Sequence, residues 1–207
     1  MDKEYLDKLR LKARNEHIPI LLDDTMEYIL GYLKREKVYS ILEIGTAVGY
    51  SAASFSTILQ PNGHIDTIEI EEIRVVQAKE NIENMDLTNV INVIHGNALD
   101  VLPKLVEENK KYDFIFIDAS KGKYLEFFEY SLELLNDNGI IIADNVLYKG
   151  MVLSDYNGHK HRTAVNKLRQ FLKYIQNLDG FKSDVIDIGD GISITRKEKE
   201  ELNGTKN

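Results

Sequence analysis

Three oxygen-bearing side chains are spaced along the sequence so that they could hold a metal ion. Asp118 ends one apolar run, and Asp144 and Asn145 end the next one. If both runs are parallel strands, their carboxyl ends lie at one edge of a sheet, so the three side chains converge there. Two carboxylates and an amide form a hard ligand set, which suits Mg²⁺ or Ca²⁺. The alternative is that each residue only caps a turn or a helix.

Lys121 follows Asp118 by three residues, so we expect it to reach the same site. A nearby cation and partial burial both favour the neutral form of a lysine. A neutral amine can remove the proton of a hydroxyl group, which makes Lys121 the candidate catalytic base. The alternative is a solvated lysine in a polar turn.

A turn with two glycines follows the first apolar run and is suited to a small ligand. Gly45 and Gly49 allow a close approach to the backbone at the start of a helix, where free N–H groups are available. The spacing lacks the G-x-G-x-x-G fingerprint, which disfavours a nicotinamide dehydrogenase. Glu43, two residues before Gly45, would repel phosphates but suits the ammonium group of a methionine moiety.

Residues after the second and third apolar runs favour a nucleoside ligand. Glu69 ends the second run, where a carboxylate can accept hydrogen bonds from both ribose hydroxyls. It could instead cap the helix that starts near Glu71. Asn97 and Ala98 follow the third run, where an adenine ring would lie: Ala98 leaves room for a flat ring, and Asn97 can form hydrogen bonds.

Apolar runs alternate with segments of helical composition, which predicts βαβ units and an α/β fold with helices on both faces of a parallel sheet. We expect strands at residues 40–44, 64–69, 90–95, 112–118 and 139–144. The intervening helices are expected at residues 50–60, 71–85, 99–109 and 122–135.

The pattern changes after residue 145. A helix is expected at 161–177, and strand-like runs at 183–188 and 192–196 flank Gly189-Asp190-Gly191, which reads as a tight antiparallel hairpin. Five parallel strands followed by such a hairpin match the Rossmann-like, seven-stranded sheet of methyltransferases that use S-adenosylmethionine. A dinucleotide-binding domain would have a parallel sixth strand instead.

One domain is expected over residues 1–207. Residues 1–36 form an N-terminal helical cap in this interpretation, with a helix at 1–15 and a second that starts with a capping box at Asp24. The stripe of Met26, Ile29, Leu30 and Leu33 indicates that this second helix packs on the core. Residues 197–207 form a polar tail.

Composition excludes several classes of protein. The 207 residues include no cysteine, so disulfides and thiolate metal sites are ruled out. No apolar run approaches the roughly 18–20 residues that span a bilayer, and the N-terminus is unlike a signal peptide. We therefore expect a cytoplasmic protein with no membrane association.

The net charge of −8 disfavours a general nucleic-acid coat, which needs a broad positive surface. The segment 149–173 is nevertheless basic and could contact RNA locally. Lys149, Lys160 and Arg162 follow the candidate metal ligands, so we expect them around the mouth of the site. The alternative is an ordinary solvated loop and helix face.

Taken together, these motifs resemble the metal-dependent O-methyltransferase family, which includes catechol and caffeoyl-CoA O-methyltransferases. The resemblance covers about residues 17–196 and rests on the glycine turn, Glu69, the Asp118–Gly122 motif and the Ala143–Val146 motif. It implies Asp118, Asp144 and Asn145 as metal ligands and Lys121 as the base. It also implies contacts to S-adenosylmethionine from Leu21, Glu43, Gly45, Ser51, Glu69, Asn97, Ala98 and Asp118.

The motifs at 17–21, 45–51, 144–150 and 189–191 are similar to those of the bacterial branch that methylates 5-hydroxyuridine at the tRNA wobble position. That branch commonly has methionine at the position of Leu21 and a denser arginine run near residues 160–162. The resemblance implies magnesium, a tRNA substrate converted to 5-methoxyuridine, and a homodimer. Small catechol-like phenols are the rival substrate, because they offer a metal the same pair of adjacent oxygens. A non-catalytic nucleoside-binding module is the rival of another class.

Overall fold

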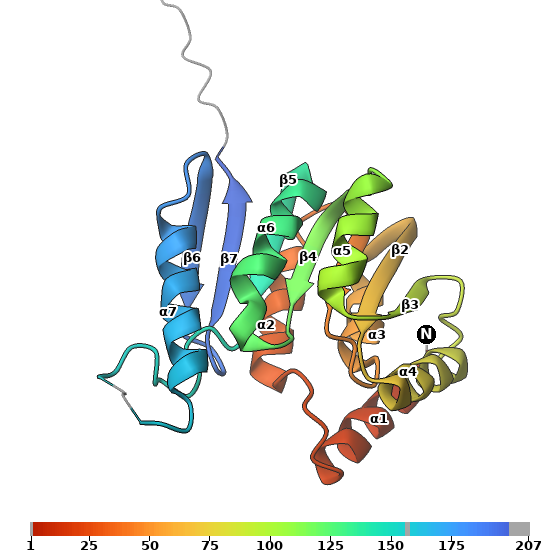
Figure 1. The fold of residues 1–207 in the computed structure, drawn as a ribbon. Coiled ribbons are helices and arrows are strands. Elements are labelled where there is room, and N and C mark those ends of the chain that lie inside the picture. The colour runs from red at the N-terminus through yellow and green to blue at the C-terminus, as the bar shows by residue number, and fades with distance from the viewer. Residues whose placement is uncertain (1, 156–157, 199–207) are drawn as a thin grey trace, which may run out of the picture.

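The computed structural model describes residues 2–155 and 158–198, which form one mixed sheet with helices on both faces (Figure 1). The strand order is β3-β2-β1-β4-β5-β7-β6. The neighbours from β3 to β5 are parallel, whereas β7 is antiparallel to both β5 and β6. The prediction of a seven-stranded, mostly parallel sheet with a C-terminal antiparallel hairpin is confirmed.

The strands are β1 (Val38–Ile44), β2 (Leu59–Glu69), β3 (Ile91–His95), β4 (Tyr112–Ile117), β5 (Leu135–Ala143), β6 (Phe181–Ile186) and β7 (Ile192–Lys197). The helices are α1 (Lys3–Asn15), α2 (Asp23–Leu33), α3 (Tyr50–Phe55), α4 (Glu72–Asn84), α5 (Ala98–Glu107), α6 (Tyr124–Leu134) and α7 (Arg162–Gln176). Two short 3-10 helices, η1 (Ser56–Ile58) and η2 (Lys121–Lys123), complete the description. Within the described ranges, no helix is long and apolar enough to cross a membrane.

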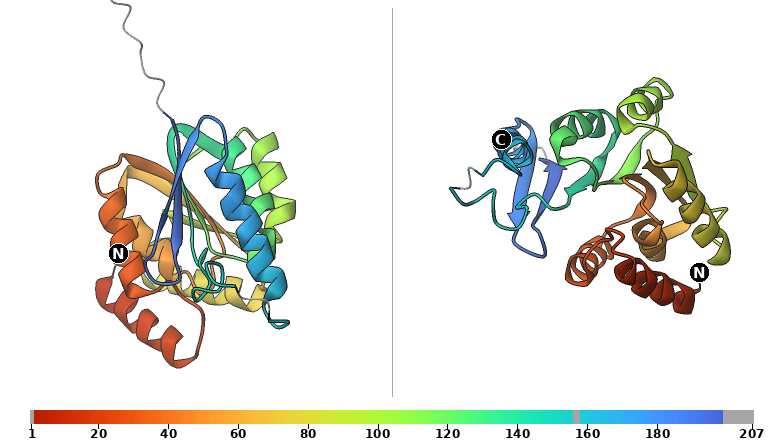
Figure 2. Two further views of the ribbon diagram at one scale, coloured as in Figure 1. Left: turned by 90° about the vertical axis from the view of Figure 1, so that its left-hand side faces the viewer. Right: turned by 60° about the horizontal axis from the view of Figure 1, so that its bottom comes forward.

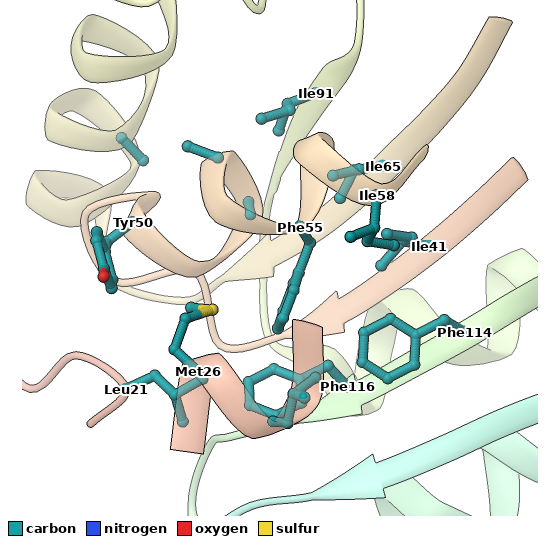
Figure 3. Close-up of a cluster of buried hydrophobic side chains, with 14 of the residues drawn as sticks. Leu21, Met26, Ile41, Tyr50, Phe55, Ile58, Ile65, Ile91, Phe114 and Phe116 are labelled. Carbon is teal, nitrogen blue, oxygen red and sulfur yellow. The ribbon is translucent and has the colours of Figure 1, made fainter. Parts of the chain in front are cut away.

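Alternate strand residues build two separate cores on the two faces of the sheet. Phe114 and Phe116 of β4 pack beneath α1–α4, whereas Ile115 and Ile117 pack beneath α5, α6 and α7. The right-hand view of Figure 2 shows the helical layers on either side of the sheet. In the first core the Phe55 ring lies edge-on to Phe114 and Phe116, with ring centroids 5.3 and 5.2 Å away (Figure 3). Burial on both faces explains why these strands are continuously apolar.

The helix predicted at 50–60 is wrong in its second half. The helix α3 ends at Phe55, η1 continues it for one turn, and Leu59 already pairs with Val38 at the start of β2. The side chain of Thr57 donates to the Ser54 carbonyl at 2.7 Å, which satisfies a carbonyl group at the end of the helix. Pro61 lacks the N–H that a continuing helix would need.

The predicted capping box at Asp24 is also wrong. The helix α2 starts at Asp23, and the residue before it has no side-chain cap. Arg10 and Arg14 of α1 bind the Asp23 carboxylate at 3.1 and 2.7 Å, so a contact between helices marks the helix start. The two helices lie within the expected cap at 1–36, and most of the predicted polar tail, from residue 199 on, lies outside the described residues.

The reversed direction of β7 determines what meets at the carboxyl edge of the sheet. Ser193, near the start of β7, pairs with Ala143, the last residue of β5. The hairpin between β6 and β7 therefore lies beside the residues that follow β5.

Candidate active site

A pocket of about 680 Å³ opens at the carboxyl edge of the parallel strands, where ligand sites of such sheets occur. Its volume is that of a small-molecule site. The walls come from the segments after β1 to β5, the loop before α2 and the tip of the β6–β7 hairpin, mainly residues 44–47, 68–71, 96–99, 118–121, 144–145, 19–22 and 190.

The turn after β1 leaves no space for a side chain at its first glycine. Gly45 has φ of +106°, and a Cβ atom there would lie 2.0 Å from the Asp118 carbonyl oxygen. Gly49, with φ of +82°, is the N-cap of α3. The turn therefore exposes backbone to the pocket, as the sequence predicted.

Glu69 lines the pocket and also holds the turn. One carboxylate oxygen accepts from the Ala47 amide at 2.8 Å and the other from the Glu71 amide at 2.9 Å. The second contact corresponds to the helix-start alternative, because Glu71 is the N-cap of α4. Each carboxylate oxygen keeps a further lone pair for a ligand hydroxyl.

Glu43 lies behind the pocket wall instead of in it. The side chain is fully buried, and one oxygen accepts from the Thr67 hydroxyl at 2.5 Å. The other, Oε1, has no hydrogen-bond partner in the described structure. Burial raises the pKa of Glu43 to about 8, although the Ser51 and Thr67 hydroxyls oppose the rise. Ser51 lines the pocket directly.

The remaining cofactor candidates line the same pocket. Asn97 is the N-cap of α5, and its Oδ1 accepts from the Leu99 amide at 3.0 Å, a capping role that the sequence interpretation did not assign. Ala98 begins that helix beside it. Leu21 also lines the pocket, from the loop between α1 and α2.

Asp118, Asp144, Asn145 and Lys121 converge at one end of the pocket, where Asp118 adjoins the glycine turn. Lys121 Nζ donates to Asn145 Oδ1 at 2.7 Å. The two Asp144 oxygens accept from the backbone and side-chain amides of Asn145, at 2.7 and 3.0 Å. The convergence that the strand ends predicted is therefore present in the structure.

The two carboxyl groups at this end are costly to ionise in the protein alone. Burial, reinforced by the charge of Asp118, raises the pKa of Asp144 to about 7. Burial also raises the pKa of Asp118, against the opposing charge of Lys121. Among the described residues, no group of three or more His, Cys, Asp or Glu side chains is arranged so that it could hold a metal ion. A cation here would use two carboxylates and one amide oxygen, a hard set that fits Mg²⁺ when other oxygens complete the shell.

Two residues that the sequence interpretation missed also shape this end. The Tyr124 hydroxyl donates to the Asp144 carbonyl at 2.8 Å, and Lys121 Nζ lies 5.9 Å from the centre of its ring. Asp190, at the tip of the hairpin, lines the pocket. The sequence offered only a turn signal for Asp190, because its place near Asp144 depends on the pairing of β7 with β5.

The basic candidates do not line the pocket. Lys149, Lys160 and Arg162 are exposed on the loop after Asn145 and at the start of α7. The ends of this loop are tied by the Tyr148 hydroxyl and His161 Nδ1, which are 3.2 Å apart.

A Rossmann-like sheet with a reversed seventh strand and a pocket over its glycine turn defines the fold of class I methyltransferases. The chain belongs to the O-methyltransferase family, whose sequence profile matches residues 2–198. The predicted family is therefore confirmed.

Named relatives agree with this assignment. The chain is 38% identical to a catechol O-methyltransferase of Niastella koreensis over 64% of its own length and 59% of that protein, and thus spans under two thirds of this relative. It is 34% identical to a Staphylococcus aureus protein described as a caffeoyl-CoA O-methyltransferase, with a TM-score of 0.86 and coverage of 93% and 92% of the two chains. An O-methyltransferase from Bacillus cereus, solved with S-adenosylhomocysteine, is 27% identical with a TM-score of 0.84 and coverage of 96% and 92%.

Proposed function

We propose that this protein transfers a methyl group from S-adenosylmethionine to a hydroxyl oxygen of an acceptor with two adjacent oxygens, with the help of Mg²⁺. The observation that carries the proposal is the meeting of Asp118, Asp144, Asn145 and Lys121 in one pocket with the glycine turn and Glu69. A nucleoside-binding module without catalysis would need only the glycine turn and Glu69.

The cofactor half of the pocket suits the parts of S-adenosylmethionine. Glu69 can accept hydrogen bonds from ribose hydroxyls, and Ala98 leaves room for a flat base. Glu43 lies buried behind the wall that Ser51 lines, and its Oε1, without a hydrogen-bond partner in the described structure, is suited to a positively charged ammonium group. Leu21 adds apolar contact from the loop before α2.

When bound, the cation supplies positive charge beside the acceptor oxygens, and S-adenosylmethionine supplies the methyl group. Asp118, Asp144 and Asn145 would hold the cation. The Lys121 amine, oriented by Asn145 Oδ1, accepts the proton of the acceptor hydroxyl. The pocket walls hold the acceptor oxygen and the methyl group in position, which supplies much of the remaining rate.

We favour 5-hydroxyuridine at the tRNA wobble position as the acceptor. Its C5 hydroxyl and C4 carbonyl are adjacent oxygens. Lys123, which lines the pocket, is paired with Glu126 at 3.0 Å, and Lys167, Lys160 and Arg162 are exposed on and before α7, so the basic groups that could contact an RNA backbone lie on this segment. A cytoplasmic location and a homodimer remain part of this proposal.

Small catechols are the second candidate, favoured by the identity with the Niastella catechol O-methyltransferase.

The deciding experiment offers the purified protein labelled S-adenosylmethionine with either tRNA bearing 5-hydroxyuridine or small catechols, with and without EDTA. We expect EDTA-sensitive labelling of the tRNA, and its collapse in Asp144→Ala while S-adenosylmethionine binding changes little. Rapid catechol methylation without tRNA labelling would favour the second candidate, and full activity in EDTA would show the oxygen cluster to be structural.

A further inference from the structure

Asp190 is a carboxylate at the acceptor end that the proposed reaction does not use. The residue lies at the tip of the β6–β7 hairpin and lines the pocket together with Asp144 and Lys121. Its side chain is partly buried, and no hydrogen bond or ion pair joins its carboxylate to any other residue of the described ranges. Its charge nevertheless acts on Asp144.

The backbone that carries Asp190 is held from one side by the segment after β5. The amides of Leu147 and Tyr148 donate to the Asp190 carbonyl at 2.9 and 3.2 Å, and the Val146 amide donates to the Gly191 carbonyl at 2.9 Å. The hairpin tip is therefore fixed to the chain that continues directly from Asp144 and Asn145.

The two glycines of the hairpin bring it into close contact with neighbouring elements. A Cβ atom at Gly189 would lie 2.3 Å from Thr25 Oγ1 of α2, and one at Gly191 would lie 2.3 Å from Leu147 Cγ. Both glycines have positive φ. The backbone that carries Asp190 is consequently held at the pocket before any acceptor binds, which lowers the entropic cost of using its carboxylate for recognition.

We propose that Asp190 determines acceptor specificity by accepting a hydrogen bond from an N–H group next to the two adjacent oxygens. The inference rests on the proposed function. In 5-hydroxyuracil the N3–H group neighbours the C4 carbonyl, and a carboxylate that accepts from it forms a charge-assisted hydrogen bond. A plain catechol has only C–H at the matching position, so the same carboxylate would lose water without gaining a partner. An acidic substituent there would be repelled.

The test removes the N3–H group from the RNA substrate and, separately, the carboxylate of Asp190 from the protein. RNA stem-loops that carry 5-hydroxyuridine or its N3-methyl derivative are compared in the wild type and in Asp190→Ala. We expect N3-methylation to lower kcat/KM by about 10- to 100-fold in the wild type, the range for a hydrogen bond to a charged group. In Asp190→Ala the two stem-loops should differ by less than about threefold, because no partner remains to be lost. The dissociation constants of the two stem-loops should differ in the wild type as kcat/KM does, and this difference should also shrink in Asp190→Ala.

Asp187→Ala is the matched control, since Asp187 is an exposed carboxylate of the same hairpin that does not line the pocket. It should keep the full N3-methyl penalty. Asp190→Asn keeps the side-chain shape and should reduce the penalty even if the alanine variant folds poorly. A penalty that persists unchanged in the position-190 variants would overturn the proposal.

Two catechols separate this inference from the tRNA proposal. If the wild type methylates catechols but no RNA, the tRNA proposal fails, and the preference between 2,3-dihydroxybenzylamine and 2,3-dihydroxybenzoate, whose charged groups stand next to the two oxygens, tests Asp190 by itself. Asp190 should favour the ammonium-bearing acceptor, and Asp190→Ala should reduce that preference at least about tenfold. An equal preference in both proteins would contradict the role of Asp190.

Discussion

Glu43 and Asp144 carry buried carboxyl groups that are harder to ionise in the folded protein than in the unfolded chain. Glu43 Oε1 has no hydrogen-bond partner in the described part of the chain, and Asp144 lies close to the partly buried carboxylate of Asp118. Groups that have lost water without full compensation gain more from an incoming positive charge than solvated groups do. These two residues therefore mark the places where a positively charged ligand is expected to bind.

Lys121 is the residue whose loss should affect chemistry more than binding. Replacing it by methionine keeps an apolar stem but removes the proton acceptor, so kcat should fall by about 10²- to 10⁴-fold. Calorimetry should show S-adenosylmethionine affinity within about twofold of the wild type. Lys104→Met, an exposed change on α5, is the control and should leave kcat unaltered. A Lys121→Met enzyme within twofold of the wild type would assign Lys121 to a solvated surface role.

Glu43 should make the stability of the free protein dependent on pH. Because the folded protein raises its pKa from 4.5 to about 8, the folded state binds a proton that the unfolded chain has released. This contribution to stability is complete below pH 4.5 and is lost as the pH rises towards about 8. The Tm of the wild type should therefore fall across this range, and the Tm of Glu43→Gln should fall less.

The exposed Glu80→Gln variant on α4 should follow the wild-type curve. Asp144, whose pKa is raised to about 7, adds a dependence of the same sign, so some decline should remain in Glu43→Gln. Identical curves for Glu43→Gln and the wild type would show that Glu43 is ionised in the folded protein.

The carboxyl ends of β1 and β4 together position the glycine turn next to the candidate metal ligand Asp118. The Gly45 amide donates to the Ile68 carbonyl at 3.0 Å, and the Asp118 amide donates to the Ile44 carbonyl at 3.0 Å. The turn and Asp118 are thus parts of one packed unit, and a change in one should move the other.

Gly45→Ala tests this coupling. The new methyl group would lie 2.0 Å from a backbone carbonyl that cannot rotate away, at a φ that alanine rarely adopts. We expect a loss of at least about 2 kcal/mol in the free energy of unfolding and loss of S-adenosylmethionine binding. Gly31→Ala in α2 has open space around it and should stabilise the protein by about 0.5–1 kcal/mol. Normal cofactor binding by Gly45→Ala would disprove the tight packing at the turn.

The sequence predicted most reliably the strands that are packed against apolar side chains on both faces of the sheet. The strands at 112–118 and 139–144 are buried on both faces, so their apolar runs identified them without knowledge of their neighbours. The start of α2 was mispredicted because Arg10 and Arg14 of another helix bind Asp23. Asp190 was seen only as a turn residue, because its place in the pocket depends on β7 pairing with β5, which no local pattern specifies.

The whole molecule is acidic, so binding of a polyanion must depend on a local surface. Charge-neutralising Lys160 and Arg162 together should weaken tRNA methylation and reduce its dependence on salt between about 50 and 200 mM, because fewer counterions are released. Lys34 and Arg35, exposed at the end of α2 that precedes β1, form the matched control pair. Methylation of a free catechol should not change in either double variant. Equal effects of both pairs on tRNA would indicate a general charge effect and no local RNA surface.

The place of the last strand has a consequence for how the chain can fold during synthesis. The strand β7 is translated last of the seven, yet it lies between β5 and β6. The sheet from β3 to β5 can form as the chain emerges, but β6 has no strand to pair with until β7 is available. Until residues 192–197 leave the ribosome, one side of β5 is an open edge that a second chain could pair with. The nascent protein should therefore be most prone to aggregation in the interval before β7 pairs with β5.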